Sequence, residues 1–356
     1  MENIHKKHSA PVLEIFIIAF FLLIPMGCAT KIPVNMMQPA EFHQASLTRT
    51  VAVLPFSGPG GADFASELEG LLGSIDINGK PYFTLVDRAS IDKVMSEMKL
   101  SQSALVDQGT AAKLGKLVGA QGIYTGTVTA NSTRDSAYKA QRSECTQYQI
   151  KRDDKGNLYQ SSNCLQYRKF YVNCTKRNAN FAATPKLIEV ATAKIVYSAN
   201  RSGAADSSGC VDGTPPKSEQ ELLDKARETV KNGIRKDVAP YYLTVMITLK
   251  DSTDGIDSKE AKALLSQGIN YADKKRLDAA CEQWGTARQL APNSPSILYN
   301  LGVCAESVAD VENAYKLYKQ ADRLIGKPDD DITLALARVN KALSTQKKLK
   351  EQMKDN

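Results

Sequence analysis

The sequence predicts an α/β domain with a mixed sheet and flanking helices, followed by an all-α domain of helical repeats. Between residues 48 and 250, short apolar runs rich in β-branched residues alternate with segments whose apolar residues recur at helical spacing. From residue 258 onward, a 34-residue period replaces this alternation. The chain has 356 residues, which is room for two domains of ordinary size.

The N-terminus has the features of an export signal. Lys6 and Lys7 precede an apolar run from residue 15 to residue 24, and Gly27-Cys28 follows. The run is too short to cross a bilayer, which needs about 20 apolar residues, and its basic start is typical of a signal peptide. We therefore predict that residues 1–27 are removed on export.

The cysteine at the end of this signal predicts how the chain is anchored. The Gly27-Cys28 ending resembles a bacterial lipoprotein signal, in which the cysteine sulfur receives a diacylglycerol and becomes the first residue of the mature chain. Ala29 resembles the signal that sorts lipoproteins to the outer membrane. The alternative is an ordinary signal peptide in which Cys28 stands by chance. We expect a lipidated tail over residues 28–47, with acyl lipid at Cys28 and no other cofactor.

The strands and helices of the α/β domain can be placed from their local patterns. The predicted strands are short and apolar, and they cover residues 50–56, 83–88, 122–129, 187–198 and 241–249. The predicted helices cover residues 62–72, 91–98 and 111–118, with Ser90 as the cap of the second. A fourth helix begins at a capping box formed by Ser218 and Glu221.

An ordered series of short segments runs through this domain. The segments are Val51-Ala52-Val53-Leu54-Pro55-Phe56, Leu85-Val86-Asp87-Arg88, Glu97, Leu100, Gly119-Ala120, Gly126-Thr127-Val128 and the run from Leu187 to Val196. The series resembles the curli production assembly/transport (CsgG-like) family over residues 48–250. The resemblance implies a periplasm-facing outer-membrane lipoprotein of a Gram-negative bacterium. The best-known members build a secretion pore from a ring of subunits, so the resemblance also raises the expectation of a homo-oligomer.

The pore of that family places two hairpins per subunit in the membrane, and this sequence disfavours both. A spanning strand needs about 9–11 residues with an apolar outward face. The stretch from Ala199 to Lys217 is too short and too polar for two such strands, and the other hairpin would carry the charged run Lys151-Arg152-Asp153-Asp154-Lys155. We therefore expect the soluble core of the family without its channel. A ring-forming secretion channel subunit is the alternative.

Residues 138–186 form a basic insertion with ten Lys or Arg and three Asp or Glu. We expect a twisted polar hairpin that turns at residues 153–157. Its cations and tyrosines could contact peptidoglycan, another anionic glycan or anionic lipid, and the alternative is a solvated, disulfide-stapled insertion. The cations chosen as a basic patch are Lys151, Arg152, Arg168 and Lys169.

Six cysteines remain when Cys28 is set aside, and an even number in an exported chain favours disulfides. The candidates are Cys145, Cys164, Cys174, Cys210, Cys281 and Cys304. No two are spaced as C-x-x-C, so the sequence indicates no zinc site. A Cys145–Cys164 bridge would close a 20-residue loop and stabilise it by about 3 kcal/mol. Cys281 with Cys304 is the preferred pairing in the helical part, while several other pairings stay open.

The C-terminal period aligns similar residues 34 positions apart. Gly268 aligns with Gly302, and Trp284 aligns with Tyr318. This pattern resembles the tetratricopeptide repeat, in which small residues let paired helices approach closely. We expect a domain over residues 258–350 with Trp284 in its core, made of repeats at 261–294 and 295–328 and a capping helix.

Solenoids of this class bind peptides in their concave groove, and we expect protein partners to bind there. The residues expected to line the groove are Leu265, Ile269, Tyr299, Asn300, Val303 and Glu306. The alternative is a structural spacer or a self-association surface, because two repeats offer only a short concave surface.

Histidine usage argues against catalysis. Only His43 lies in the predicted mature chain, and one imidazole in a mobile tail serves neither an acyl-transfer triad nor a metal site. We predict no catalytic residue, no metal and no nucleic-acid partner. The expected protein is a non-catalytic scaffold or accessory factor in envelope assembly or secretion. It would be held to the outer membrane by its lipid alone and would contact envelope proteins.

Overall fold

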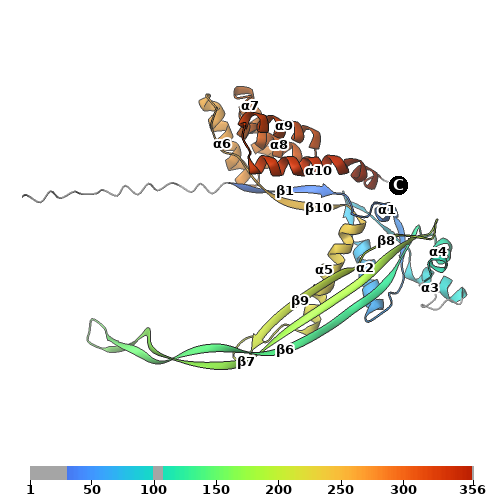
Figure 1. Ribbon diagram of the computed structural model, residues 1–356, viewed down its shortest axis with the longest axis horizontal. Coiled ribbons are helices and arrows are strands. Elements are labelled where there is room, and N and C mark those ends of the chain that lie inside the picture. The colour runs from blue at the N-terminus through green and yellow to red at the C-terminus, as the bar shows by residue number, and fades with distance from the viewer. Residues whose placement is uncertain (1–29, 99–106, 355–356) are drawn as a thin grey trace, which may run out of the picture.

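A computed structural model describes residues 30–98 and 107–354. The predicted signal peptide, the lipidation site Cys28 and Leu100 of the family resemblance lie outside these residues. Within the described ranges, no helix combines the length and the apolar character that crossing a membrane requires. The chain folds into an α/β body with a long two-stranded arm, and a helical domain lies beside the body (Figure 1).

A mixed sheet forms the centre of the α/β body, as predicted. Its strands are β2 (Thr50–Val53), β5 (Thr84–Leu85), β6 (Gly122–Arg152), β7 (Leu158–Glu189), β8 (Lys194–Ser198) and β9 (Arg201–Cys210). They follow the order β5-β2-β6-β7-β8, and β9 also pairs with β7. β2 runs parallel to β5 and β6, whereas β7 pairs antiparallel with β6, β8 and β9. A separate small hairpin joins β3 (Asp76–Ile77) and β4 (Lys80–Pro81).

Helices cover both faces of this sheet. They are α2 (Gly61–Gly73), α3 (Arg88–Glu97), α4 (Gln108–Leu117) and α5 (Glu219–Val238). Successive strand residues point to opposite faces, so Val51 and Val53 share a buried core with α2 and α5. Ala52 and Leu54 share the other core with α3 and α4. The continuous apolar run of β2 is therefore explained by burial on both sides.

The helix caps confirm one prediction and correct another. The Ser218 hydroxyl accepts the Glu221 backbone N–H at 3.1 Å and caps α5, as predicted. The cap of α3 is Asp87, whose carboxylate accepts the Ser90 backbone N–H at 3.1 Å. The prediction of Ser90 as the cap is wrong, because aspartate caps a helix as well as serine does and Asp87 stands one turn earlier. The helix therefore begins at Arg88 and contains Ser90.

A two-stranded ribbon takes the place of the tail predicted over residues 28–47. β1 (Lys31–Gln38) pairs antiparallel with β10 (Tyr241–Thr248), and α1 (His43–Leu47) follows β1. Ile32 and Val34 are buried in the same core as the C-terminal helices. The prediction that residues 241–249 form a strand is confirmed, but the strand does not close the main sheet, since its partner is β1.

Five helices form the C-terminal domain, and they lie where the repeats and the capping helix are predicted. They are α6 (Lys259–Asp273), α7 (Leu277–Leu290), α8 (Pro295–Ser307), α9 (Val311–Ile325) and α10 (Asp330–Gln352). Trp284 is fully buried, as predicted, and its indole N–H donates to the Leu265 carbonyl oxygen at 3.2 Å. The tetratricopeptide assignment itself stays a prediction.

Gly268→Ala is expected to destabilise the helical domain by about 1–3 kcal/mol. A Cβ at Gly268 would stand 2.1 Å from Trp284 Nε1, so the indole would have to leave its packed position. Gly285→Ala is the matched control, because a Cβ there meets no described atom within 4 Å and alanine favours a helix. Urea unfolding followed by the fluorescence of Trp284, the single tryptophan, measures both variants. Equal midpoints would contradict the close approach of α6 and α7.

The end of α10 docks onto the α/β body. The Gln352 side-chain oxygen accepts the Ala40 N–H at 2.8 Å, and the Gln352 carbonyl oxygen accepts the Tyr82 hydroxyl at 3.2 Å. His43 lies at this junction, with Nε2 3.0 Å from a Glu351 carboxylate oxygen. The expectation of a histidine in a mobile tail is therefore wrong, because α1 places His43 beside α10.

Candidate functional site

The most distinctive surface of the molecule is a long arm formed by β6 and β7. These strands span 31 and 32 residues, against roughly 5–6 for a typical strand. Their outer halves leave the sheet and run to a tip well away from the body (Figure 1). We define the arm as residues 138–174, which begins where the pairing of β7 with β9 ends.

The tip of the arm is the turn predicted at residues 153–157. The Asp153 carboxylate accepts the backbone N–H groups of Lys155 and Asn157 at 2.9 and 2.8 Å. These bonds, foremost the one from the Asn157 backbone, hold the pKa of the Asp153 carboxyl below its usual value. Gly156 has a φ of 83°, the left-handed conformation that glycine adopts without strain. The predicted polar hairpin is therefore confirmed.

The structure pairs all six candidate cysteines. The bridges are Cys145–Cys164, Cys174–Cys210 and Cys281–Cys304. The first joins β6 to β7 midway along the arm, and the second joins β7 to β9 at its base, so both brace the arm. The third joins α7 to α8 and is the pairing that the sequence favoured.

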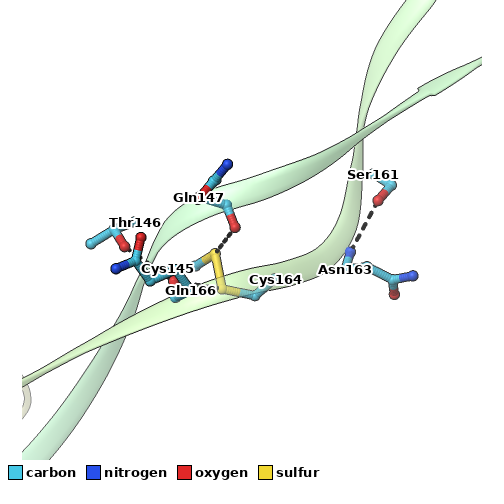
Figure 2. Close-up of a disulfide and its surroundings, with 7 residues drawn as sticks. All are labelled: Cys145, Thr146, Gln147, Ser161, Asn163, Cys164 and Gln166. Carbon is cyan, nitrogen blue, oxygen red and sulfur yellow. Dashed lines mark hydrogen bonds between the residues drawn. A yellow bond between two sulfur atoms is a disulfide. The ribbon is translucent and has the colours of Figure 1, made fainter.

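Figure 2 shows the irregular stretch around the first bridge. The β6–β7 ladder shifts register three times between Cys145 and Ile150. The Thr146 hydroxyl donates to the Gln166 carbonyl oxygen at 3.1 Å beside the sulfur atoms. Because such bulges interrupt the ladder, the covalent bond to Cys164 keeps the two strands of the outer arm together at their weakest point.

The four cations of the predicted basic patch do not come together. Lys151 and Arg152 lie beside the tip, whereas Arg168 and Lys169 lie about 30 Å further in along β7. Arg168 and Lys169 are adjacent in the strand and therefore point to opposite faces. The Arg168 Nε donates to Glu144 at 2.6 Å. The prediction of a single patch is wrong because it rested on charge and not on strand register.

The strand register brings a different set of residues together, which charge alone did not identify as a group. Tyr167, Lys169 and Tyr171 stand at alternate positions of β7 and so share one face of the arm. The two tyrosines are 63% and 67% exposed, which is unusual for large aromatic side chains. The period-two spacing Tyr-x-Lys-x-Tyr is visible in the sequence and would have marked this face.

The predicted partner groove is closed by the protein's own chain. Ile269 is half-buried, and the other five expected residues are buried: Leu265, Tyr299, Asn300, Val303 and Glu306. The Asn300 amide donates to the Lys250 carbonyl oxygen at 2.7 Å, and its side-chain oxygen accepts the Lys250 N–H at 3.0 Å. The Lys250 ammonium lies 2.8 Å from Asp329. The expectation of an open groove is wrong, because the β1–β10 ribbon and the segment between β10 and α6 cover it.

Two buried carboxylates are neutralised by arginines inside the protein. Asp237 is 1% exposed and accepts the Arg201 Nε–H and the Tyr197 hydroxyl, each at 2.8 Å. Glu306 is 6% exposed and accepts the Arg338 Nε–H at 2.6 Å. The first pair ties α5 to β9, and the second ties α8 to α10. In the described part of the chain, no three His, Cys, Asp or Glu side chains are grouped so as to hold a metal ion.

The body and arm together define a class of α/β protein: a mixed sheet with helices on both faces that extends one strand pair into a braced projection. Residues 77–214 match the family model described as curli production assembly/transport component CsgG. This range runs from the end of β3 to the loop after β9 and contains the whole arm. The CsgG-like resemblance is therefore confirmed for this part of the chain.

Several solved structures are similar to the chain at low identity. The LpoB C-terminal domain from Salmonella enterica is 17% identical, with 44% of this chain and 82% of that chain covered, at a TM-score of 0.25. Lipoprotein GNA1162 from Neisseria meningitidis is 14% identical, with 52% and 97% covered, at a TM-score of 0.27. A dodecameric PelC variant from Paraburkholderia phytofirmans is 12% identical, with 59% and 99% covered, at a TM-score of 0.25. These values are too low to support an inference about function. No curated protein matches the chain.

Proposed function

We propose that this protein is a lipid-anchored, periplasm-facing outer-membrane lipoprotein that acts as a non-catalytic scaffold or accessory factor in envelope assembly or secretion. The observation that carries the proposal is the match of residues 77–214 to the CsgG family, in a body that projects a disulfide-braced arm. Disulfides persist in oxidising compartments such as the periplasm, which supports export. A rigid arm suits a protein that contacts a partner at a distance from its own anchor.

The C-terminal helices supply a second contact surface in this proposal. Their 34-residue period supports the tetratricopeptide assignment. The assignment is also supported by the packing of Gly268 beneath Trp284 and of Gly302 beneath Tyr318, because both contacts require glycine. Since the β1–β10 ribbon and the linker around Lys250 cover the concave side, envelope proteins would bind the outer surface of this domain.

A ring-forming secretion channel of the curli type is the second candidate, and the description of the matching family favours it. The position of β9 favours the accessory role instead. A Cβ at Gly203 of β9 would stand 2.1 Å from the Ala226 carbonyl oxygen of α5, so β9 lies packed on a helix of the body. Oligomer mass and planar-bilayer recordings separate the two candidates, because a ring with stable single-channel currents would establish the channel.

The lipid anchor is tested by labelling cells with an alkyne fatty acid. We expect the wild-type protein to carry the label and to sediment with the outer membrane, and we expect Cys28→Ser to lose the label completely, since Cys28 supplies the only thiol of the predicted lipidation signal. Cys281→Ser is the matched control and should keep the label, because its thiol pairs with Cys304. An unlabelled wild-type protein with an unmodified thiol by mass spectrometry would rule out the anchor.

A further inference from the structure

One face of the arm presents tyrosines and lysines at regular spacing. We call it the tyrosine–lysine face, and it carries Lys139 and Gln141 on β6 and Tyr167, Lys169 and Tyr171 on β7. The register places Gln141 directly opposite Tyr171, so the two strands contribute to one continuous surface. All five of these residues are exposed.

The opposite face of the arm differs from it. Val172 and Cys174 are buried there. The Arg142 Nε on that face donates to Asp212 at 2.9 Å, in the segment that follows β9. The arm is therefore covered on one side at its base, while the tyrosine–lysine face looks into solvent.

The tyrosine–lysine face is cationic, because none of its five residues is acidic and the neighbouring Glu144 stands opposite Arg168 and bonds to it on the other face. Among the described residues, neither Lys139 nor Lys169 takes part in an ion pair, in contrast to Arg142 and Arg168 of the same arm. Asp135 lies further toward the base and is bound by Arg177, with both hydrogen bonds at 2.8 Å. This face therefore has positive charge that is not neutralised within the protein.

We propose that the tyrosine–lysine face binds a linear anionic glycan along the length of the arm. Exposed aromatic rings offer flat apolar surfaces for the C–H faces of sugar rings, and ammonium groups pair with carboxylates or other anions. The two tyrosines are four residues apart, which is about 13 Å along a strand, so they contact different sugars of one chain. The amide of Gln141 adds a hydrogen-bond donor and acceptor between them.

The composition of this face separates a glycan from other partners. None of its five residues is aliphatic, and the exposed aliphatic side chains of the outer arm, Ile150, Leu158 and Leu165, lie further toward the tip, so the face itself does not suit insertion into a lipid bilayer. A peptide would add to the free strand edge of the arm and not to its face. Single-stranded nucleic acid also stacks on aromatic rings beside cations. The choice of a glycan over nucleic acid rests on the proposed function, because an exported arm meets envelope glycans.

The test measures binding of the full chain, purified in detergent, to a fluorescent oligogalacturonate, a linear glycan with a carboxylate on each sugar. We expect the double variant Tyr167→Ala/Tyr171→Ala to lose affinity by about tenfold. We expect Lys169→Gln to lose about threefold at low salt and to show a weaker salt dependence. Tyr138→Ala is the matched control on the opposite face, since Tyr138 is 43% exposed. Circular dichroism should show that every variant folds, because all of these side chains are exposed.

Three results would overturn the inference. They are no binding by the wild-type chain, an equal loss in Tyr138→Ala, and tighter binding to phosphatidylglycerol vesicles or to a single-stranded oligonucleotide than to the glycan. Equal affinity for an uncharged cello-oligosaccharide would also overturn the role of Lys169. The fatty-acid label on Cys28 is read independently, so a labelled protein that binds no glycan contradicts this inference and leaves the anchor intact. An unlabelled protein that binds the glycan contradicts the anchor and leaves this inference intact.

Discussion

We expect the protein to unfold cooperatively as the pH rises above about 10, because four buried tyrosines resist ionisation in the folded state. Burial is the largest cause that raises the pKa of each of these phenols well above the usual value of 10.0, and they are Tyr124, Tyr197, Tyr299 and Tyr318. In the unfolded chain the same groups lose their protons near pH 10. Their contribution to stability is therefore complete below pH 10 and is lost as the pH rises toward the raised folded-state values.

The expected loss is large because the four groups act together. Each tyrosine that ionises only in the unfolded state lowers the free energy of unfolding by about 1.4 kcal/mol per pH unit above 10. If the chain unfolds as one unit, the slope is about 5 kcal/mol per pH unit, and it is about half of that in each domain if the domains unfold separately. Between pH 9 and 12, tyrosinate absorbance measures the ionisation of the tyrosines and circular dichroism measures unfolding in the same sample. We expect the exposed tyrosines to ionise first.

Tyr124→Phe isolates one of these groups. Within the described structure the Tyr124 hydroxyl is buried and has no hydrogen-bond partner, so its removal should leave stability at pH 7 nearly unchanged. It should reduce the alkaline slope by about 1.4 kcal/mol per pH unit. Tyr171→Phe is the control, since Tyr171 is 67% exposed and its removal should not change the slope. Ionisation of all tyrosines near pH 10 with the fold retained would contradict the expectation.

Elements with a local signal could be predicted from the sequence. The β-branched run of β2 and the cap at Ser218 each specify their own conformation within a few residues. The turn at Asp153 is equally local, because its carboxylate bonds to backbone groups only two and four residues ahead. For the same reason the bridge from Cys145 to Cys164 followed once a hairpin with this turn was expected.

Elements that depend on distant partners could not be predicted. β1 pairs with β10, and Lys31 lies opposite Thr248 across more than 200 residues of sequence. β1 also buries only two side chains, Ile32 and Val34, so its alternation is too short to stand out from a polar tail. The pattern that marks a strand carries no information on which strand will pair with it.

The predictions of the partner groove and of the basic patch were wrong for related reasons. The repeat pattern identified residues that face inward, and Asn300 does hold a peptide backbone, but the backbone is that of Lys250 in the same chain. On the arm, charge alone grouped Lys151 with Lys169, while the strand register separates them. Periodicity gives the direction of a side chain, and only the tertiary structure shows what covers it.

Arg338→Ala is expected to destabilise the helical domain by about 3–5 kcal/mol, because it leaves Glu306 buried without its counter-charge. Glu306 is 6% exposed and accepts two hydrogen bonds from the Arg338 guanidinium, at 2.6 and 2.7 Å. The Tyr318 hydroxyl donates a third at 2.8 Å, which cannot replace a positive charge. Urea unfolding followed by Trp284 fluorescence measures the change, and Arg323→Ala on the exposed side of α9 should shift it by less than about 0.5 kcal/mol.

A second substitution distinguishes the contribution of the Arg338 charge to stability from that of its packing. In the Arg338→Ala background, Glu306→Gln removes the unpaired charge and should recover a large part of the lost stability, because a neutral amide costs less to bury than a carboxylate. A double variant as unstable as Arg338→Ala would show that the arginine acts through its packing alone.

The Glu306–Arg338 pair also helps to hold the linker between β10 and α6. The pair joins α8 to α10, and Asp329 at the start of α10 binds the Lys250 ammonium in this linker. Loss of the pair should therefore raise proteolysis of the segment between β10 and α6 before the domain unfolds.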